Sequence, residues 1–129
     1  MQRHMFKSKL HRAKVTEAEL HYEGSLSVDQ DLMDAAEMIP HEMIAVYNIN
    51  NGERFETYII PAPRGSRVFC LNGAAARKGE VGDKIIIVTS CWLEEAELAA
   101  HQPLAVLLDD DNEIVKITRE EQHGLRVAQ

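Results

Sequence analysis

The sequence predicts a mainly β protein that folds as a compact barrel with two short helices. Its apolar residues fall in short runs that are rich in β-branched and aromatic side chains and are bounded by Gly, Pro, Asn or Asp. Only two stretches read as helices, so the regular strand–helix alternation of a β-α-β sheet is missing. The chain has 129 residues and is 45% hydrophobic, which fits one domain, 1–129, with its own core.

The runs expected to form strands share this composition and these boundaries. They are the region around Phe6–Val15, then Met43–Ile49, Phe55–Ile60, Val68–Leu71, Lys84–Cys91, Leu104–Leu108 and Glu113–Ile117. Asn51-Gly52 predicts a hairpin between the second and third of these strands, because both residues tolerate positive φ. Pro61 and Pro63 then close the second strand of that hairpin.

Two helices are expected. Ser27 or Asp29 is a suitable cap for the first, DQDLMDAAEM, whose apolar face would hold Leu32, Ala35, Ala36 and Ile39. The second, Leu93–His101, has strong helix formers and acidic residues in its first turn. The run Asp109–Asp111 predicts a solvated turn, and the residues after Ile117 predict a frayed polar tail.

Composition excludes several classes of function. Lys and Arg number 14 and Asp and Glu number 21, and the net charge of −7 argues against general nucleic-acid binding. No signal segment and no membrane-length apolar run is seen, so we expect a cytoplasmic protein without a membrane partner. Cys70 and Cys91 lie in apolar runs and are expected to be buried free thiols, as in a reducing compartment. The histidines lack metal-ligand spacing, so no metal is expected.

The charge is unevenly distributed along the chain. Residues 1–24 carry five Lys and Arg against three Glu, a net of +2, whereas residues 25–129 carry nine against eighteen, a net of −9. This asymmetry suggests that the two segments attract each other. On charge alone, however, a few solvated surface charges are the simpler interpretation.

Gly24-Ser25, within HYEGS, has an ordinary and a chemical interpretation. Gly-Ser pairs are common in turns, and taken alone that interpretation is favoured. Glycine also accepts strained backbone angles, and the serine hydroxyl lies next to the glycine carbonyl carbon. A strained peptide here can undergo an N-to-O acyl shift, and elimination and hydrolysis would then leave a pyruvoyl group, which acts as an electron sink.

A second candidate region runs from Arg54 to Ala76. In a strand, Arg54, Glu56 and Tyr58 share one face, and Phe55 and Thr57 share the other. Thr57 and Tyr58 therefore serve one site only if the strand end twists or the site wraps around it. The small residues after Asn72 suit either a tightly packed turn or a close approach of backbone N–H groups to a ligand.

Three segments in fixed order resemble the pyruvoyl-dependent bacterial aspartate 1-decarboxylases. They are KLHRAKVTEAELHYEGS, NGERFETYIIPAPRGS and LNGAAARKGEVGDKIIIV. The similarity runs from about Met1 to about Leu108, and the combination is far more specific than any single motif. It implies a double-psi β-barrel that assembles as a homotetramer with active sites between subunits.

The resemblance also implies how the protein would work. The precursor would cleave itself at Gly24-Ser25 into a β chain, 1–24, and an α chain, 25–129, with Ser25 becoming the pyruvoyl cofactor in place of any metal or PLP. L-Aspartate would form a Schiff base with that group, lose carbon dioxide and leave as β-alanine, which supplies pantothenate and coenzyme A synthesis. Some members need a separate maturation factor, which is a candidate partner here.

The roles that the resemblance implies are assigned position by position. Ser25 would be the cofactor precursor, Tyr58 the proton donor to the carbanion, and Thr57 a residue of both processing and substrate contact. Substrate binding would further involve Lys9, Arg54, Gly73, Ala74 and Ala75. The supporting polar residues would be His11, Tyr22 and Asn72.

Two alternatives remain open from sequence. One is a pyruvoyl decarboxylase of another acidic amino acid such as glutamate, because one methylene is worth only about 1–3 kcal/mol in a pocket. The other is a β-barrel interaction module in which the Gly24-Ser25 turn stays uncleaved.

Overall fold

The computed structural model describes residues 1–124 and confirms a mainly β protein. Nine strands form one mixed sheet in the order β2-β6-β3-β5-β4-β7-β1-β8-β9. The strands are β1 (Gln2–Lys14), β2 (Glu17–Glu19), β3 (Ser25–Asp29), β4 (Met43–Asn48), β5 (Arg54–Ala62), β6 (Phe69–Asn72), β7 (Lys84–Glu94), β8 (Leu104–Leu108) and β9 (Ile114–Thr118). This arrangement is consistent with a barrel, and the double-psi connectivity stays a prediction.

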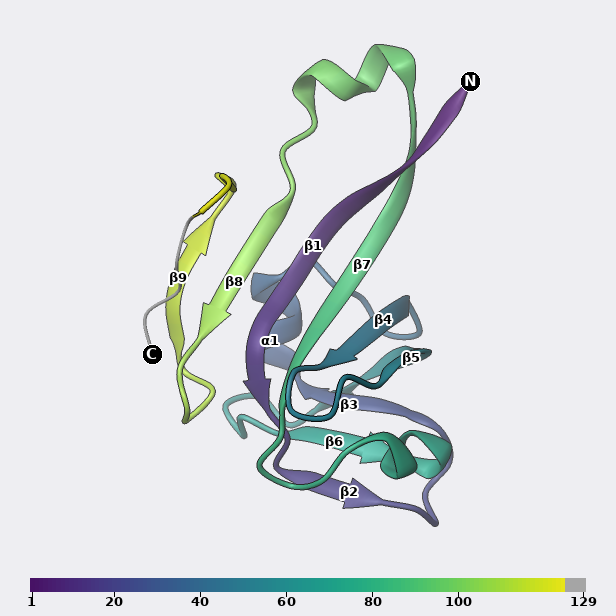
Figure 1. The fold of residues 1–129 in the computed structure, drawn as a ribbon, viewed down its shortest axis with the longest axis vertical. Helices are drawn as coiled ribbons and strands as arrows, with labels where there is room; N and C mark the ends of the chain where they lie inside the picture. Colours follow the sequence, from purple (N-terminus) through teal and green to yellow (C-terminus); the bar gives the residue numbers. More distant parts are fainter. Residues whose placement is uncertain (125–129) are drawn as a thin grey trace.

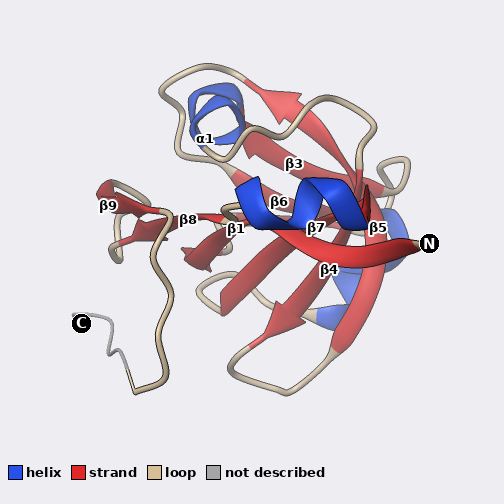
Figure 2. Cartoon of the chain, turned by 90° about the horizontal axis from the view of Figure 1, so that it is seen from above, coloured by secondary structure: helices blue, strands red, loops and turns tan. Residues whose placement is uncertain are grey.

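The two longest strands, β1 and β7, run antiparallel side by side and extend together beyond the other strands (Figure 1). On its other side β1 pairs in parallel with β8, so it lies inside the sheet. The β1–β7 register shifts between Leu10 and Ala13, and Arg12 at this bulge has a φ of 65°. Seen from above, the β8–β9 pair lies to one side of the remaining strands (Figure 2).

Strand β3 lies between β5, with which it pairs in parallel, and β6, with which it pairs antiparallel. Leu26 and Val28 on this strand are fully buried and belong to one hydrophobic core with Ile59, Phe69 and Leu71. A strand flanked on both edges and apolar on its buried side is held firmly in register, because a slip would expose its core residues. Ser25, the first residue of β3, therefore has a well-defined position.

The helices differ from the expectation. The first, α1 (Gln30–Ala35), is capped by Asp29 as predicted, but it ends early and leaves Ile39 65% exposed. In the segment Leu93–His101, the first two residues end β7 and the 3-10 helix η2 (Glu95–Ala100) follows directly. A third short helix, η1 (Gly73–Lys78), is also of the 3-10 type and was not expected. For Leu93–His101, the composition indicated helical backbone but could not distinguish α from 3-10 geometry.

The predicted hairpin is confirmed, because β4 and β5 pair antiparallel from Met43↔Tyr58 to Tyr47↔Arg54. Its loop is longer than a two-residue turn, and of its central pair only Gly52 has positive φ, at 77°. Strand β5 ends at Ala62, between the two prolines. The short strands β2 and β3 were not predicted, since three to five residues carry little periodic signal.

Other expectations fare as follows. Both cysteines are free, but only Cys70 is buried and Cys91 is partly exposed. The Asp109–Asp111 run is a turn in which Asp109 Oδ1 accepts from the backbone N–H of Asp111 and of Glu113. In the part of the chain from residue 1 to 124, no helix has the length and apolar character needed to cross a membrane. Residues 125–129 of the predicted tail lie outside the described residues.

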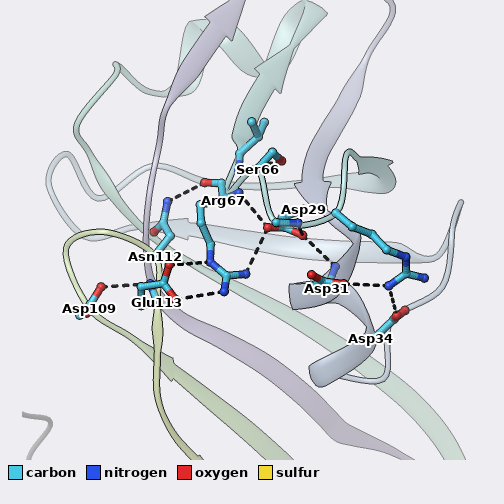
Figure 3. A network of polar contacts seen from close by, with 11 residues as sticks. Asp29, Asp31, Asp34, Ser66, Arg67, Asp109, Asn112 and Glu113 are labelled. Carbon is cyan, nitrogen blue, oxygen red and sulfur yellow. Dashed lines mark hydrogen bonds and ion pairs between the residues drawn. The ribbon is translucent and has the colours of Figure 1, made fainter.

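A buried carboxylate holds the far end of β3 (Figure 3). Asp29 is fully buried, and its Oδ1 accepts from the backbone N–H of Asp31 at 2.8 Å and of Gly65 at 3.1 Å. Its Oδ2 accepts from the backbone N–H of Arg67 at 2.7 Å and from Arg67 Nη1 at 3.2 Å. The same guanidinium donates to both carboxylate oxygens of Glu113, each at 3.0 Å.

Asn112 extends this network to the end of β1. Its Nδ2 donates to the carbonyls of Lys14 and Arg67, each at 3.0 Å, and its Oδ1 accepts from the Lys14 N–H at 2.7 Å. The side chain is buried and the backbone has a φ of 60°, a conformation that asparagine tolerates better than most residues. Four segments that are distant in sequence therefore meet around Asp29.

We predict that Asp29→Asn lowers the free energy of unfolding at neutral pH by about 2–3 kcal/mol, because an amide replaces a charged acceptor of several N–H donors. Burial opposes the charge of Asp29, but the N–H groups of Arg67, Asp31 and Gly65 and the Arg67 charge outweigh it and lower its pKa from the usual 3.8. A depressed pKa stabilises the fold above the unfolded pKa, and this contribution is lost as the pH falls through the folded value.

Urea unfolding at pH 7 and below pH 4 measures both effects. The loss caused by Asp29→Asn should shrink at the lower pH. The control is Asp34→Asn, which removes an exposed partner of Arg64 and should change stability much less. Equal losses in the two variants would contradict the prediction.

Candidate active site

Ser25 combines burial with an unusual backbone conformation. Its exposure is 1% and its φ is 117°, in a region that residues with a Cβ rarely adopt. Such a conformation costs on the order of 1–3 kcal/mol and persists only when the surroundings enforce it. Here the enforcement comes from the pairing of Ser25 with Asn72 across β3 and β6. The Gly24-Ser25 peptide therefore lies at a strained point next to a buried hydroxyl.

The Asn72 side chain contacts two serines of β3. Its Nδ2 donates to Ser25 Oγ at 3.0 Å and to Ser27 Oγ at 2.7 Å, and its Oδ1 accepts from the Cys70 thiol at 3.0 Å. Asn72 is 2% exposed, so these contacts satisfy the amide away from water. The Ser25 hydroxyl oxygen thus has a fixed N–H donor pointing at it.

Gly73 presses against the backbone that precedes Ser25. Its φ is 63°, and a Cβ placed there would lie 2.9 Å from the Tyr22 carbonyl oxygen and 3.0 Å from Gly24 Cα and N. Only glycine permits both this backbone angle and this close approach. The side chain of Tyr22 itself points outward, and the residue is 59% exposed. Tyr22 therefore contributes its backbone carbonyl to the site, and its side chain does not take part.

A cavity of about 180 Å³ opens beside Ser25. Since one water takes up about 30 Å³ of liquid, it has room for a small amino acid. Its lining consists of Gly24, Ser25, Phe55, Glu56, Thr57, Asn72, Ala74, Ala75 and Lys78. Asn72, Ala75 and Lys78 recur every three residues, the period of the 3-10 helix η1, which is why they share a face.

Several of the predicted site residues lie elsewhere in the same chain. Within the described residues, neither Arg54 nor Tyr58 lines the cavity, whereas the three residues between Arg54 and Tyr58 on β5 all do. The Arg54 guanidinium carbon lies 4.0 Å from the centre of the Tyr47 ring. The Tyr58 ring lies 6.2 Å from that of His41.

Lys9 and His11 lie on β1, four positions from β3 in the strand order. Lys9 Nζ contacts Glu121 Oε2 at 3.0 Å. Burial, with Lys9 and Arg12 nearby, lowers the pKa of His11 against the opposing influence of Glu121, so the imidazole is neutral at pH 7. Among residues 1–124, the buried His11 Nδ1 has no hydrogen-bond partner.

The sequence analysis missed Cys70, Ser27, Glu56 and Lys78, all of which contact Asn72 or line the cavity. Period-two spacing from Asn72 back to Cys70, and from Ser25 to Ser27, was a usable signal, because alternate residues of a strand share a face. Lys78 required knowledge of the 3-10 helix. Residues 1–124 contain no group of three His, Cys, Asp or Glu arranged to hold a metal ion.

At this site a hydroxyl lies next to the Gly24-Ser25 peptide bond, whose serine has positive φ, an amide N–H donates to that hydroxyl, and a cavity lies beside them. These are the groups that an N-to-O acyl shift would require. A family sequence profile described as Aspartate decarboxylase matches residues 1–115. The chain belongs to the aspartate decarboxylase family.

Individual relatives agree with the family match. The chain is 64% identical over 112 residues to the aspartate 1-decarboxylase of Syntrophobacter fumaroxidans, covering 87% of this chain and 90% of that protein. It is 59% identical over 111 residues to that of Maricaulis maris, covering 86% and 92%. The protein of the same name from Heliobacterium modesticaldum is 55% identical over 124 residues, covering 96% and 94%. The resemblance noted from sequence is thereby confirmed at the level of the family.

We predict that Gly73→Ala lowers the free energy of unfolding by about 1–3 kcal/mol more than Gly52→Ala does, because overpacking adds to the shared cost of positive φ. Gly52 is a matched control, since its φ is 77° and a Cβ there meets nothing within 4 Å. Chemical denaturation of the two variants measures the difference. Similar losses would show that the backbone of residues 22–24 moves aside without cost.

Proposed function

We propose that this protein is a self-processing, pyruvoyl-dependent decarboxylase that converts L-aspartate into β-alanine and carbon dioxide. The observation that carries the proposal is the buried Ser25, held at positive φ with Asn72 Nδ2 donating to its hydroxyl at the wall of a cavity. The names of the relatives supply the substrate, and their identity over most of the chain makes a shared reaction the simplest assumption.

Maturation would begin at the Gly24-Ser25 peptide bond. Ser25 Oγ loses its proton and attacks the Gly24 carbonyl carbon, the C–N bond breaks, and the freed nitrogen takes a proton to give an ester. Loss of the Ser25 Cα proton then expels the Gly24 carboxylate from Cβ, and water releases the nitrogen as ammonia to leave a pyruvoyl group. Asn72 Nδ2 is placed to stabilise negative charge on Oγ during the first step.

The two chains produced in this way, 1–24 and 25–129, would stay together. Strand β1 pairs with β7 on one side and β8 on the other, and its Leu10 and Ala13 are fully buried in the core. Ion pairs also cross between the segments, including Lys7 with Glu42 at 3.0 Å. The charge asymmetry of the sequence therefore has a physical use, although the buried strand contributes more than these partly exposed pairs.

The pyruvoyl group would supply a carbonyl that captures the substrate amine and an electron sink for the departing carboxylate. The residues around Ser25 suit this group, since Gly24, Ala74 and Ala75 are small and Asn72 offers an N–H. Thr57 and the backbone of residues 73–75 would then contact the substrate. A cation would hold the carboxylate that the product retains.

Lys9 and Arg54 are the cations proposed for this purpose, with Tyr58 as the proton donor after decarboxylation. Within one chain they lie away from the cavity, so we propose that a neighbouring subunit of a homotetramer completes each site. The buried His11 Nδ1, unpartnered within residues 1–124, supports a neighbouring group near β1. A maturation factor is a further candidate partner. The product would feed pantothenate and coenzyme A synthesis in the cytoplasm, where free thiols such as Cys70 and Cys91 persist.

We predict that the purified, matured protein separates under denaturing conditions into two chains split after Gly24. The larger chain should be lighter by one ammonia than hydrolysis of the peptide would leave it, and intact mass spectrometry measures this. Ser25→Ala should give a single uncleaved chain without activity, because the attacking hydroxyl is gone. A wild-type chain that stays whole after prolonged incubation would contradict the proposal and favour an interaction module.

We also predict that Tyr58→Phe cleaves normally but decarboxylates aspartate at least tenfold more slowly, since general-acid catalysis contributes about 10²–10⁴-fold. Carbon dioxide release from aspartate and from glutamate measures both the activity and the choice of substrate. Full activity of Tyr58→Phe would remove this residue from the reaction. Faster turnover of glutamate than aspartate would replace the proposed substrate.

A further inference from the structure

We propose that Cys70 is a positioning residue for self-cleavage, whose thiol orients the Asn72 amide so that Nδ2 faces Ser25 Oγ. The inference rests on the proposed function, because it concerns the step that opens the Gly24-Ser25 bond. It assigns a task to a buried cysteine that the site chemistry does not otherwise use.

The contacts form a short buried relay. Cys70 Sγ lies 3.0 Å from Asn72 Oδ1, and Asn72 Nδ2 lies 3.0 Å from Ser25 Oγ. Cys70 is 3% exposed and Asn72 is 2% exposed, so water does not compete for these groups. Cys70 and Asn72 are alternate residues of β6 and therefore project to the same face of the sheet.

The orientation of the Asn72 amide decides whether the Ser25 hydroxyl faces a hydrogen-bond donor or an acceptor. With Nδ2 toward Ser25, an N–H donor faces the oxygen that carries negative charge when it loses its proton, before it attacks the Gly24 carbonyl. If the amide were turned over, Oδ1 would instead accept the hydroxyl proton and hold it on Oγ. A donor on the far side of Asn72 favours the first arrangement, because it offers a hydrogen bond only to Oδ1.

The Cys70 thiol is such a donor. Burial, together with the neighbouring Glu17 and Glu19 carboxylates, raises the pKa of Cys70 to about 11, so the sulfur keeps its proton at neutral pH. Glu17 lies opposite Cys70 in the β2–β6 pairing, and its negative charge favours the protonated thiol. The single thiol proton is the one that Asn72 Oδ1 accepts, and a thiolate at this position would attract Nδ2 instead.

A purely structural role for Cys70 is the competing explanation, because a buried cysteine also packs as a small hydrophobic residue. The two explanations differ in what Cys70→Ser does. Serine keeps a donor of similar size, whereas alanine and valine have none. If Cys70 only packs, the cleavage rate should fall in proportion to the change in side-chain volume. If Cys70 positions Asn72, the rate should fall only where the hydrogen-bond donor is absent.

The experiment follows cleavage of freshly made precursor by intact mass over time, beside the melting temperature of each variant. Loss of one neutral hydrogen bond predicts cleavage about fivefold to tenfold slower in Cys70→Ala. Cys70→Ser should cleave within about twofold of wild type. Cys91→Ala, which removes the other free cysteine, is the matched control and should cleave at the wild-type rate.

Two further variants complete the test. Cys70→Val fills the site with an apolar side chain that has no donor, so it replaces Cys70→Ala if that variant does not fold. It should also cleave slowly. In an Asn72→Ala background, adding Cys70→Ala should slow cleavage no further, because the amide to be oriented is gone. If Cys70 only packs, Cys70→Ala should slow cleavage equally in the wild-type and Asn72→Ala backgrounds.

The outcomes separate the two proposals. If the wild-type precursor cleaves and Cys70→Ala cleaves at the same rate, the role of Cys70 is overturned and the proposed function stands. Equal slowing in Cys70→Ser and Cys70→Ala would also overturn it, in favour of packing. A wild-type precursor that never cleaves would overturn both.

Discussion

The position of the Gly24-Ser25 peptide depends on hydrogen bonds at both ends of β3. At the far end, the Asp29 carboxylate collects N–H groups from α1 and from the loop around Arg67. At the near end, Asn72 holds the Ser25 hydroxyl while the backbone stays at positive φ. The strained conformation persists because the buried strand between these ends cannot slide or rotate without exposing Leu26 and Val28.

Much of the fold could be predicted from local patterns. Runs of β-branched residues predicted the long strands. Asn51-Gly52 indicated the turn of the β4–β5 hairpin, and the prolines indicated the end of its second strand. Strand β3 was not predicted because its five residues are held extended by pairing with β5 and β6, which are distant in sequence. The 3-10 geometry of η1 and η2 depends in the same way on tertiary contacts that composition does not carry.

The candidate site could be predicted to a different extent. Motif resemblance led directly to Gly24, Ser25, Thr57 and the Asn72–Ala75 segment, and the structure brings these together around one cavity. Of the two neighbouring β5 residues that the resemblance pointed to, Thr57 lines the cavity and Tyr58 does not. Period-two spacing could place Cys70 on the same face as Asn72, but the contact of its sulfur with the Asn72 amide oxygen at 3.0 Å required the structure.

The interior position of β1 has a consequence for the molecularity of folding. In the uncut chain, β1 reaches β7 and β8 as part of the same molecule, at the high effective concentration that covalent linkage provides. If the chain is cut after Gly24 as proposed, the same pairing becomes an encounter between two molecules. Refolding of the matured protein would then depend on protein concentration, whereas refolding of the precursor subunit would not. Cleavage would thus convert unimolecular folding of the subunit into a bimolecular association.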